Sequence, residues 1–166
     1  MSQTLHFPPS SRGPLEPYLP PTTTTTTTTT SSSASLPHLT LTFATSLDSA
    51  ISLSPGTQTV LSGPESKAMT HYLRSRHAAI LVGAGTAVAD DPGLNCRVEG
   101  CDGLESQPRP VVLDPRGRWE VTEQSKVIEL ARRGRGLGPY VLVGEGTEVG
   151  EERRRVVEGG GGSMWA

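Results

Sequence analysis

The side chains best suited to chemistry lie close together, between Arg74 and Arg97. A Gly-Ala-Gly-Thr turn, with glycines at Gly83 and Gly85, follows a short apolar run and precedes a short helical pattern. Glycines let a backbone approach an anion closely, and a helix N-terminus presents free N–H groups to it. The turn therefore predicts a phosphate-binding loop. A plain tight turn fits equally well, because the dinucleotide fingerprint would need a third glycine where the chain has Val88.

Two acidic residues and a threonine follow the glycine turn. Thr86 and Asp90 are four residues apart, so on one helical turn both side chains reach the same ligand. Asp90 and Asp91 precede Pro92, and the pair suits either a metal or acid site or a turn in which one carboxylate binds backbone N–H. The sequence favours the turn, and we predict no metal site.

An arginine stands at each end of this stretch. Arginine is the preferred bidentate partner of phosphate groups. Arg74 falls near the C-terminus of a predicted helix, where a cation is favourable without any function, whereas Arg97 lies in a predicted loop. His71 and His77 flank Arg74 and have no partner visible in the sequence, so we interpret both as structural.

Charge and composition exclude several classes of protein. The 166 residues carry a net charge of −2 with a pI near 6.1, so no basic patch favours nucleic acid or an anionic membrane surface. No run approaches the roughly 18 apolar residues of a membrane span. Cys96 and Cys101 fit no zinc spacing and are typical of a reducing compartment, so we expect a cytoplasmic protein.

The chain divides into a low-complexity segment at 1–35 and a folded domain at 36–166. The first segment contains many prolines and an unbroken threonine run, and its few apolar residues predict disorder. In the domain, hydrophobic periodicity and turn residues predict strands at 39–44, 78–82, 110–114 and 140–143 and helices at 62–76, 86–90, 122–133 and 151–158. This alternation predicts an α/β fold with a mostly parallel sheet flanked by helices.

Four motifs together suggest a family. LTLTFATSLD, the S-x-P-E-x-K-x-M-T-H-Y-L-R-S-x-H pattern, ILVGAGTAVADDPGLNCR and PRPVVLDPRGR closely resemble the fungal 2,5-diamino-6-ribosylamino-4(3H)-pyrimidinone 5′-phosphate reductases of riboflavin synthesis. The chain is similar, more loosely, to the reductase domain of the bacterial bifunctional deaminase-reductase. The resemblance covers about residues 37–157. The H-x-E and P-C-x-x-C signature of the zinc deaminase half is absent from the sequence.

The resemblance implies a dihydrofolate-reductase-like fold, NADPH as hydride donor and a homodimer. It also implies NADPH-dependent reduction of the ribosylamino side chain of a phosphorylated pyrimidine to the ribitylamino compound. The residues that match cofactor-binding positions are Ala44, Gly83, Gly85, Thr86 and Asp90. The residues that match substrate-binding positions are Arg74, Leu94 and Arg97. No residue is assigned as the catalytic acid.

The C-terminal part departs from the family pattern. Family members continue into a Glu-Gly-Gly motif whose backbone contacts the cofactor phosphates. Glu158, Gly159 and Gly160 have that sequence but lie only 44 residues after Asp114, so we interpret them as a coincidence and expect a domain truncated at its C-terminus. Two alternatives follow: a non-catalytic fragment of the reductase, or a dihydrofolate-reductase-like enzyme for another pyrimidine or pterin substrate.

Overall fold

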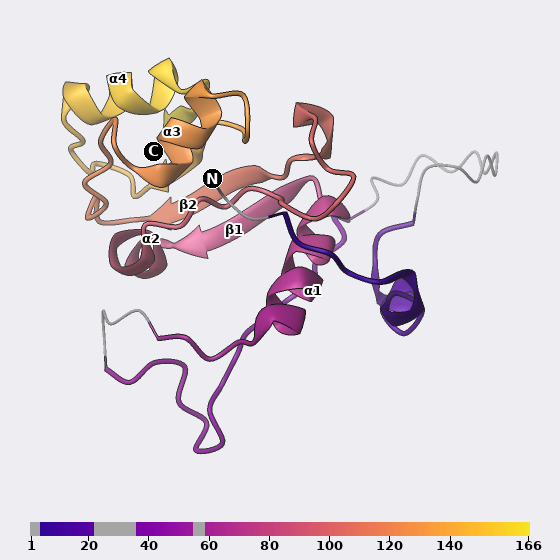
Figure 1. Ribbon diagram of the computed structural model, residues 1–166. Helices are drawn as coiled ribbons and strands as arrows, with labels where there is room; N and C mark the ends of the chain where they lie inside the picture. Colours follow the sequence, from indigo (N-terminus) through magenta and orange to yellow (C-terminus); the bar gives the residue numbers. More distant parts are fainter. Residues whose placement is uncertain (1–3, 22–35, 55–58) are drawn as a thin grey trace.

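A parallel sheet forms the centre of the molecule. The computed structural model describes residues 4–21, 36–54 and 59–166. Four strands pair in the order β1-β2-β3-β4, and every neighbouring pair is parallel (Figure 1). The strands are β1 (Ala79–Gly83), β2 (Arg109–Asp114), β3 (Tyr140–Val143) and β4 (Ser163–Trp165). The helices are α1 (Pro64–Ser75), α2 (Ala84–Asp90), α3 (Lys126–Arg132) and α4 (Glu151–Gly159), with 3-10 turns at Pro9–Ser11, Glu16–Tyr18 and Leu104–Ser106. The predicted parallel α/β arrangement is confirmed.

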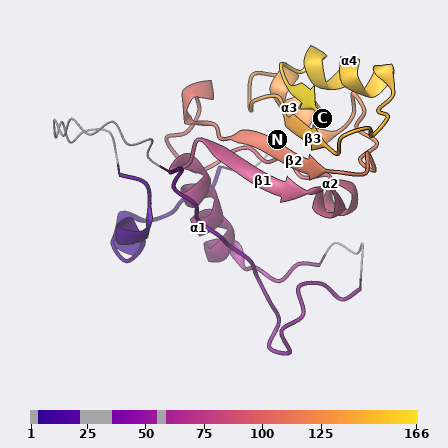
Figure 2. The ribbon, with the colours of Figure 1, turned by 180° about the vertical axis from the view of Figure 1, so that it is seen from behind.

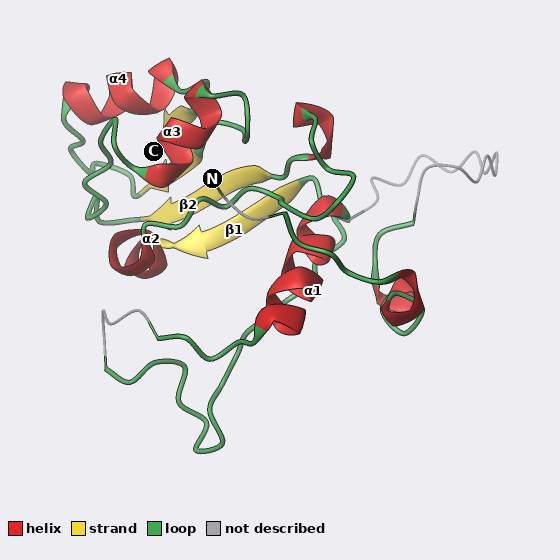
Figure 3. Ribbon diagram, in the orientation of Figure 1, coloured by secondary structure: helices red, strands yellow, loops and turns green. Residues whose placement is uncertain are grey.

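Helices α3 and α4 cover one face of the sheet (Figure 3). Side chains from alternate strand positions meet these helices, and Val112, Ile128, Val141 and Val157 are each at most 1% exposed. We call the whole group the sheet cluster: Ala87, Val112, Trp119, Val121, Val127, Ile128, Val141, Val156, Val157 and Met164. Each crossover between parallel strands contributes a helix or loop to this cluster, so the sheet and its cover form from consecutive chain segments.

The opposite face of the sheet is open in the described part of the chain. Leu81, Leu113, Leu142 and Trp165 point to this face and are 59%, 38%, 37% and 46% exposed. The strands predicted at 78–82 and 110–114 therefore form, with one face buried or half-buried and the other more exposed. The reason is that α1 buries its apolar side against residues 5–19 and 96–101 rather than against the strands.

The predicted strand at 39–44 does not form. Residues 36–54 contain no strand, and Leu39, Leu41 and Phe43 are 87%, 82% and 76% exposed. In two opposite views this segment loops away from the sheet (Figures 1 and 2). Alternating apolar residues show where a strand can form, but a strand also needs a neighbouring backbone to pair with, and no described segment pairs here.

The N-terminal residues 4–21 are packed against α1, contrary to the predicted disorder. Phe7 and Leu19 are 7% and 6% exposed, and the Phe7 ring stacks on Tyr72 at 5.1 Å between centroids. We call this group the N-terminal cluster: Phe7, Leu19, Ala68, Tyr72, Cys96 and Val98. A few well-spaced apolar residues in a proline-rich segment are enough to bury it against a neighbouring helix. The threonine run at 22–30 lies outside the described residues.

Two helices begin later than predicted, α1 at Pro64 and α3 at Lys126. Ser62 and Glu65 have the spacing of a capping box but do not form one, because Gly63 is the N-cap of α1 and makes no side-chain cap bond. Helix α3 begins at Lys126 rather than near residue 122. Among the described residues, no helix is long and apolar enough to cross a bilayer.

Strand β4 was not predicted. It has only three residues and pairs with β3 from Tyr140↔Ser163 to Leu142↔Trp165. The turn before it must pass close to β3: a Cβ on Gly162 would collide with the Pro139 carbonyl oxygen, so only glycine fits. A three-residue strand has too short a pattern for its periodicity to show.

Candidate functional site

The glycine turn lies where β1 ends and α2 begins. Gly83 is both the last residue of β1 and the N-cap of α2. A Cβ added to Gly83 or Gly85 would meet no atom within 4 Å, and Gly85 and Thr86 are exposed. The backbone here faces open space, so a ligand can approach it directly.

The carboxyl ends of β1, β2 and β3 share one edge of the sheet, because the three strands are parallel. The loops after β2 and β3 are tied together there: the Gly144 N–H and the Thr147 hydroxyl donate to the Pro115 carbonyl at 3.2 and 3.0 Å. Ligands of open α/β sheets bind at this edge. The sequence predicts a binding loop only after β1, and the structure adds the loops after β2 and β3 to the same edge of the sheet.

Asp114 holds the first of these loops in place. It is 2% exposed at the end of β2, and its two carboxylate oxygens accept the backbone N–H groups of Arg118 and Trp119 at 2.9 and 2.8 Å. Sequence reasoning did not single out Asp114. The available signal was an Asp-Pro-x-Gly turn directly after a buried strand, which is typical of a side chain that binds its own loop.

A hollow of about 380 Å³ separates α2 from the loop after β2. Its lining residues include Ala87 and Val88 of α2, together with Arg118 and Trp119 of the loop. The hollow lies beside the helix that follows the glycine turn, and Arg118 supplies a cation to its wall. Its volume and its position at the carboxyl edge suit an extended ligand.

The adjacent aspartates have different surroundings. Asp91 adopts a left-handed backbone (φ 39°) that closes α2, and its carboxylate accepts the Lys126 N–H at 3.1 Å. Asp91 therefore closes a turn and binds a backbone N–H through its carboxylate, as the sequence favoured. Among the described residues, the Asp90 carboxylate makes no hydrogen bond or ion pair, and it remains free for a ligand.

The two arginines of the predicted substrate site lie close enough together for the charge of Arg97 to act on Arg74. Helix α1 carries His71 and Arg74 three residues apart, and the loop containing Arg97 passes over this side of the helix. Arg74 donates from Nη1 to the Asn95 carbonyl at 2.9 Å, while its Nε is buried without a partner in the described structure. The Arg97 backbone N–H donates to Nδ1 of His71 at 3.0 Å.

The positive charges of Arg74 and Arg97 around His71 are not balanced by an ion pair in the described part of the chain. Burial, together with the Arg97 charge, lowers the pKa of Arg74 to about 10, so its guanidinium remains charged at neutral pH. Burial and the charges of Arg74 and Arg97 lower the pKa of His71 to about 3, which keeps the ring neutral. Within the described ranges, no carboxylate forms an ion pair with Arg74 or Arg97. Partly buried cations without a carboxylate partner favour an anionic ligand.

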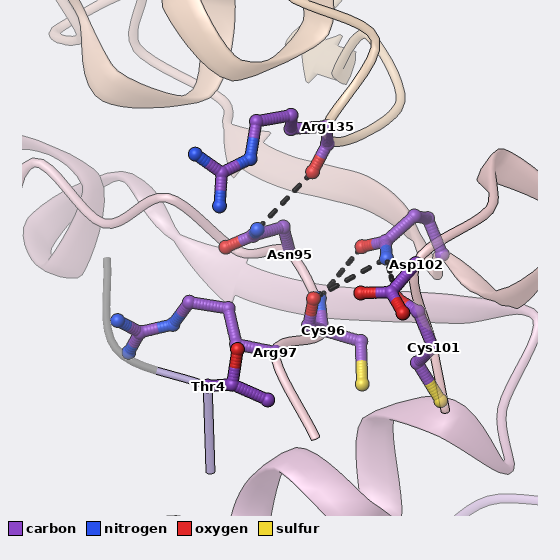
Figure 4. Close-up of a pocket in the computed structure, with 8 residues that line it drawn as sticks. Thr4, Asn95, Cys96, Arg97, Cys101, Asp102 and Arg135 are labelled. Atoms are coloured by element: carbon purple, nitrogen blue, oxygen red, sulfur yellow. Dashed lines mark hydrogen bonds between the residues drawn. The ribbon is translucent and has the colours of Figure 1, made fainter. Parts of the chain in front are cut away.

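A hollow of about 50 Å³ adjoins Arg97 (Figure 4). Arg97 and Arg135 extend their guanidinium groups to the same side, with Asn95 between them. Asn95 is fixed by a hydrogen bond from its Nδ2 to the Arg135 carbonyl at 3.1 Å, and Asp102 is the acidic residue of the lining. The hollow has room for a small polar group rather than for a whole nucleoside.

Cys96 lines this hollow, and its contacts indicate a structural role. Its thiol is 3% exposed and donates to the His71 carbonyl at 3.1 Å. Burial raises the pKa of this thiol to about 11, so it stays protonated and is a poor nucleophile at neutral pH. The cysteine helps to hold α1 against the loop that contains Arg97.

Leu94 and Ala44 are placed differently from the other predicted site residues. Leu94 is 3% exposed and has a left-handed backbone (φ 52°), which is strained for a residue with a branched side chain. Ala44 is exposed in the segment 36–54, which pairs with no strand of the sheet. The structure therefore gathers Arg74 and Arg97 at one place, and Gly83, Gly85, Thr86 and Asp90 at another.

The Glu158-Gly159-Gly160 segment ends α4. Gly160 N–H donates to the Val156 and Val157 carbonyls, and Gly161, with φ 74°, donates to the Glu158 carbonyl. These are the contacts of a helix C-cap in which glycine adopts the left-handed conformation. The segment then leads directly into β4, so its glycines form the turn between α4 and β4.

Comparison with known proteins identifies the family of this chain. The family described as the RibD C-terminal domain matches residues 37–160. The 2,5-diamino-6-ribosylamino-4(3H)-pyrimidinone 5′-phosphate reductases of Eremothecium gossypii and Debaryomyces hansenii are 50% and 46% identical to this chain. Each match covers 82% of this chain, and 54% and 51% of the respective relative. The chain spans about half the length of the curated relatives it matches.

Solved structures show the same fold. The riboflavin biosynthesis reductase Rib7 of Saccharomyces cerevisiae matches with a TM-score of 0.54 at 35% identity, over 74% of this chain and 45% of that one. RibD of Acinetobacter baumannii matches with a TM-score of 0.55 at 25% identity, over 74% and 31%. These neighbours have the dihydrofolate-reductase-like fold, so the predicted fold class is confirmed. The match over residues 37–160, together with these relatives, shows that the chain belongs to the RibD C-terminal domain family.

Proposed function

We propose that this protein reduces 2,5-diamino-6-ribosylamino-4(3H)-pyrimidinone 5′-phosphate to the ribitylamino compound, with NADPH as the reductant. The observation that carries this proposal is the pair Arg74 and Arg97, which come from separate segments and meet without a carboxylate partner among the described residues. A substrate phosphate would supply the missing negative charge. The names of the most similar relatives support the same substrate.

The residues at the carboxyl edge fit a nicotinamide dinucleotide. Gly83 and Gly85 offer open backbone, and Thr86 and Asp90 offer side chains that make no ion pair in the described part of the chain. We propose that these four residues hold NADPH. Ala44 can join them only if the segment at 39–44 comes to lie along the sheet.

The chain's own residues would act mainly by positioning. NADPH, held by these residues, would supply the hydride needed to reduce C1′ of the opened ribosylamine. Arg74 and Arg97 would hold the phosphate end, and so fix the distance and orientation of C1′. We assign no proton donor among the side chains, and water can supply the proton.

A kinetic comparison of two arginine variants tests the proposal. Purified protein is mixed with NADPH and the pyrimidine substrate, and the loss of the reduced nicotinamide absorbance is followed. We expect oxidation that depends on the phosphorylated substrate and slows by at least about tenfold in Arg97→Met, since a hydrogen bond to a charged group contributes about 1.5–3 kcal/mol. The exposed Arg133→Met, on the C-terminal end of α3, serves as control. NADPH oxidation that ignores the 5′-phosphate, or that prefers a pterin, would contradict this assignment.

We further propose that the protein acts as a cytoplasmic homodimer with no nucleic-acid or membrane partner. The open sheet face formed by Leu81, Leu113, Leu142 and Trp165 supports an association surface, because exposed apolar patches of this kind mark interfaces. Light scattering on the purified chain tests the dimer, and imaging of a fluorescent fusion tests the location. A protein that stays monomeric at all concentrations would contradict the proposed homodimer.

A further inference from the structure

The contacts of the two ring nitrogens of His71 are not explained by the structural role predicted for this residue. The ring is 5% exposed and contacts Arg97 through both nitrogens, Nδ1 at 3.0 Å from the backbone nitrogen and Nε2 at 3.2 Å from Nη2. A backbone N–H can only donate, so Nδ1 must be the acceptor and carry no proton. A neutral imidazole then holds its proton on Nε2.

This tautomer places two donors against each other. Guanidinium nitrogens also only donate, so the contact between His71 Nε2 and Arg97 Nη2 joins N–H to N–H. The opposite tautomer would relieve this contact but would turn an Nδ1–H against the Arg97 backbone N–H. That backbone group cannot rotate away, whereas the Arg97 side chain can. The Nε2–H form is therefore the favoured one.

A hydrogen-bond acceptor shared by the two N–H groups would remove this unfavourable contact. One oxygen of an oxyanion can accept from both Nε2–H and Nη2–H, and Arg74 Nε is a further buried donor without a partner in the described structure. Burial and the two neighbouring arginines keep the pKa of His71 at about 3, so the ring gives a neutral N–H rather than a third positive charge.

We propose that His71 is a ligand-binding residue whose neutral Nε2–H donates to an oxyanion, in concert with Arg97. The inference rests on the proposed function for the identity of the ligand as the substrate's phosphate, but its chemistry requires only an oxyanion. A neutral donor adds directionality that two flexible guanidinium groups lack. It favours a ligand with an oxygen lone pair at this position over one that merely carries negative charge.

Nitrogen-15 NMR of the His71 ring on the full chain at neutral pH tests the assignment, with inorganic phosphate as the probe. We expect a proton-bearing Nε2, an unprotonated Nδ1, and a downfield shift of the Nε2 proton on phosphate addition. The opposite tautomer, or an Nε2 resonance unchanged by saturating phosphate, would overturn the proposal.

Binding of phosphate to three variants gives a second readout. His71→Leu removes the acceptor and the donor, and we expect phosphate affinity to fall about 10- to 100-fold, as for one hydrogen bond to a charged group. His71→Gln retains an amide oxygen for the Arg97 N–H and an amide N–H for the anion, so it should restore affinity to within about threefold. If His71→Leu fails to fold, the NMR result and the Gln variant still decide the matter.

His77→Gln is the matched control, because His77 lies just after α1 but binds the Leu73 carbonyl and the Thr40 hydroxyl instead. It should leave phosphate binding unchanged, and a loss equal to that of His71→Leu would contradict the proposal. Phosphate binding through His71 without NADPH oxidation would refute the proposed function alone. Reductase activity with no response of His71 to phosphate would refute this inference alone.

Discussion

The sheet cluster and the N-terminal cluster differ in how the chain builds them. All members of the sheet cluster lie between residues 87 and 164, in consecutive strand and helix segments. The N-terminal cluster joins Phe7 and Leu19 to residues 68–98, across a long stretch of chain. The first cluster has the most completely buried side chains, whereas members of the second are 3–7% exposed.

The two clusters also have different consequences for the site. Backbone hydrogen bonds connect Leu5 N–H to the Arg97 carbonyl at 2.8 Å and Glu99 N–H to the Leu5 carbonyl at 2.9 Å. Tyr72 of the N-terminal cluster directly follows His71 on α1. The sheet cluster therefore maintains the fold, while the N-terminal cluster maintains the geometry of the arginine site. Residues before the family match, which begins at 37, contribute to that geometry.

The largest expected effect is on the sheet cluster. Ile128→Ala should lower the free energy of unfolding by about 4 kcal/mol, because it removes three methyl(ene) groups from a fully buried position. Chemical denaturation followed by circular dichroism measures the change. Ile51→Ala, at a position 71% exposed, should change stability by less than about 0.5 kcal/mol. Similar losses for both variants would remove the distinction between core and surface.

The next effect tests the N-terminal cluster. Phe7→Ala should cost about 2–3 kcal/mol, somewhat below the range for fully buried phenylalanines, because the ring lies in a smaller cluster. It should also weaken phosphate binding, since the strap formed by residues 4–21 supports the Arg97 loop. Phe43→Ala, at a position 76% exposed, is the control. Unchanged phosphate binding in Phe7→Ala would show that the N-terminal cluster does not support the site.

A pH effect should distinguish the site from the sheet cluster. The pKa of His71 is about 3 in the folded protein and near 6.5 when unfolded, so below pH 6.5 the unfolded state binds the proton more strongly. The contribution is complete above pH 6.5 and is lost as pH falls toward 3. Between pH 7 and pH 5 the wild type should lose about 2 kcal/mol more than His71→Gln. Parallel pH profiles for the two proteins would contradict the lowered pKa.

The smallest effect is expected on the open face of β3, with the buried face of the same strand as the reference. Leu142→Thr, on the open face, should change the free energy of unfolding of the dilute protein by less than about 0.5 kcal/mol. Val141→Thr, one residue earlier and 1% exposed, should cost about 1–3 kcal/mol because it buries a hydroxyl. Equal costs would show that the open face is covered in solution.

Local patterns predicted several parts of this molecule well. The strand at 140–143 and the helix ending before Gly160 follow from short-range periodicity and helix signals, and the structure has both. The glycine turn at Gly83 also lies where a strand meets a helix, as expected. These features depend on interactions within a few residues, which a single sequence displays.

Other features depend on partners that are distant in the sequence. The alternation at 39–44 predicts a strand that does not form, because a strand also needs a neighbouring backbone to pair with. His71 looked structural because its partner Arg97 is 26 residues away. Phe7 and Leu19 looked too sparse to fold, yet α1 offers them an apolar surface. In each case the missing information is a contact between segments.

The sequence by itself determined the family and the parallel α/β class, and it predicted Arg74, Arg97 and Asp90 as ligand-binding residues. Hydrophobic periodicity and motif spacing encode these properties locally. Only the tertiary structure decided that Arg74 and Arg97 meet around a neutral His71, that residues 4–21 support them, and that one sheet face stays open in the described chain. The physical reason is that burial, pKa and hydrogen-bond direction depend on which distant groups surround an atom.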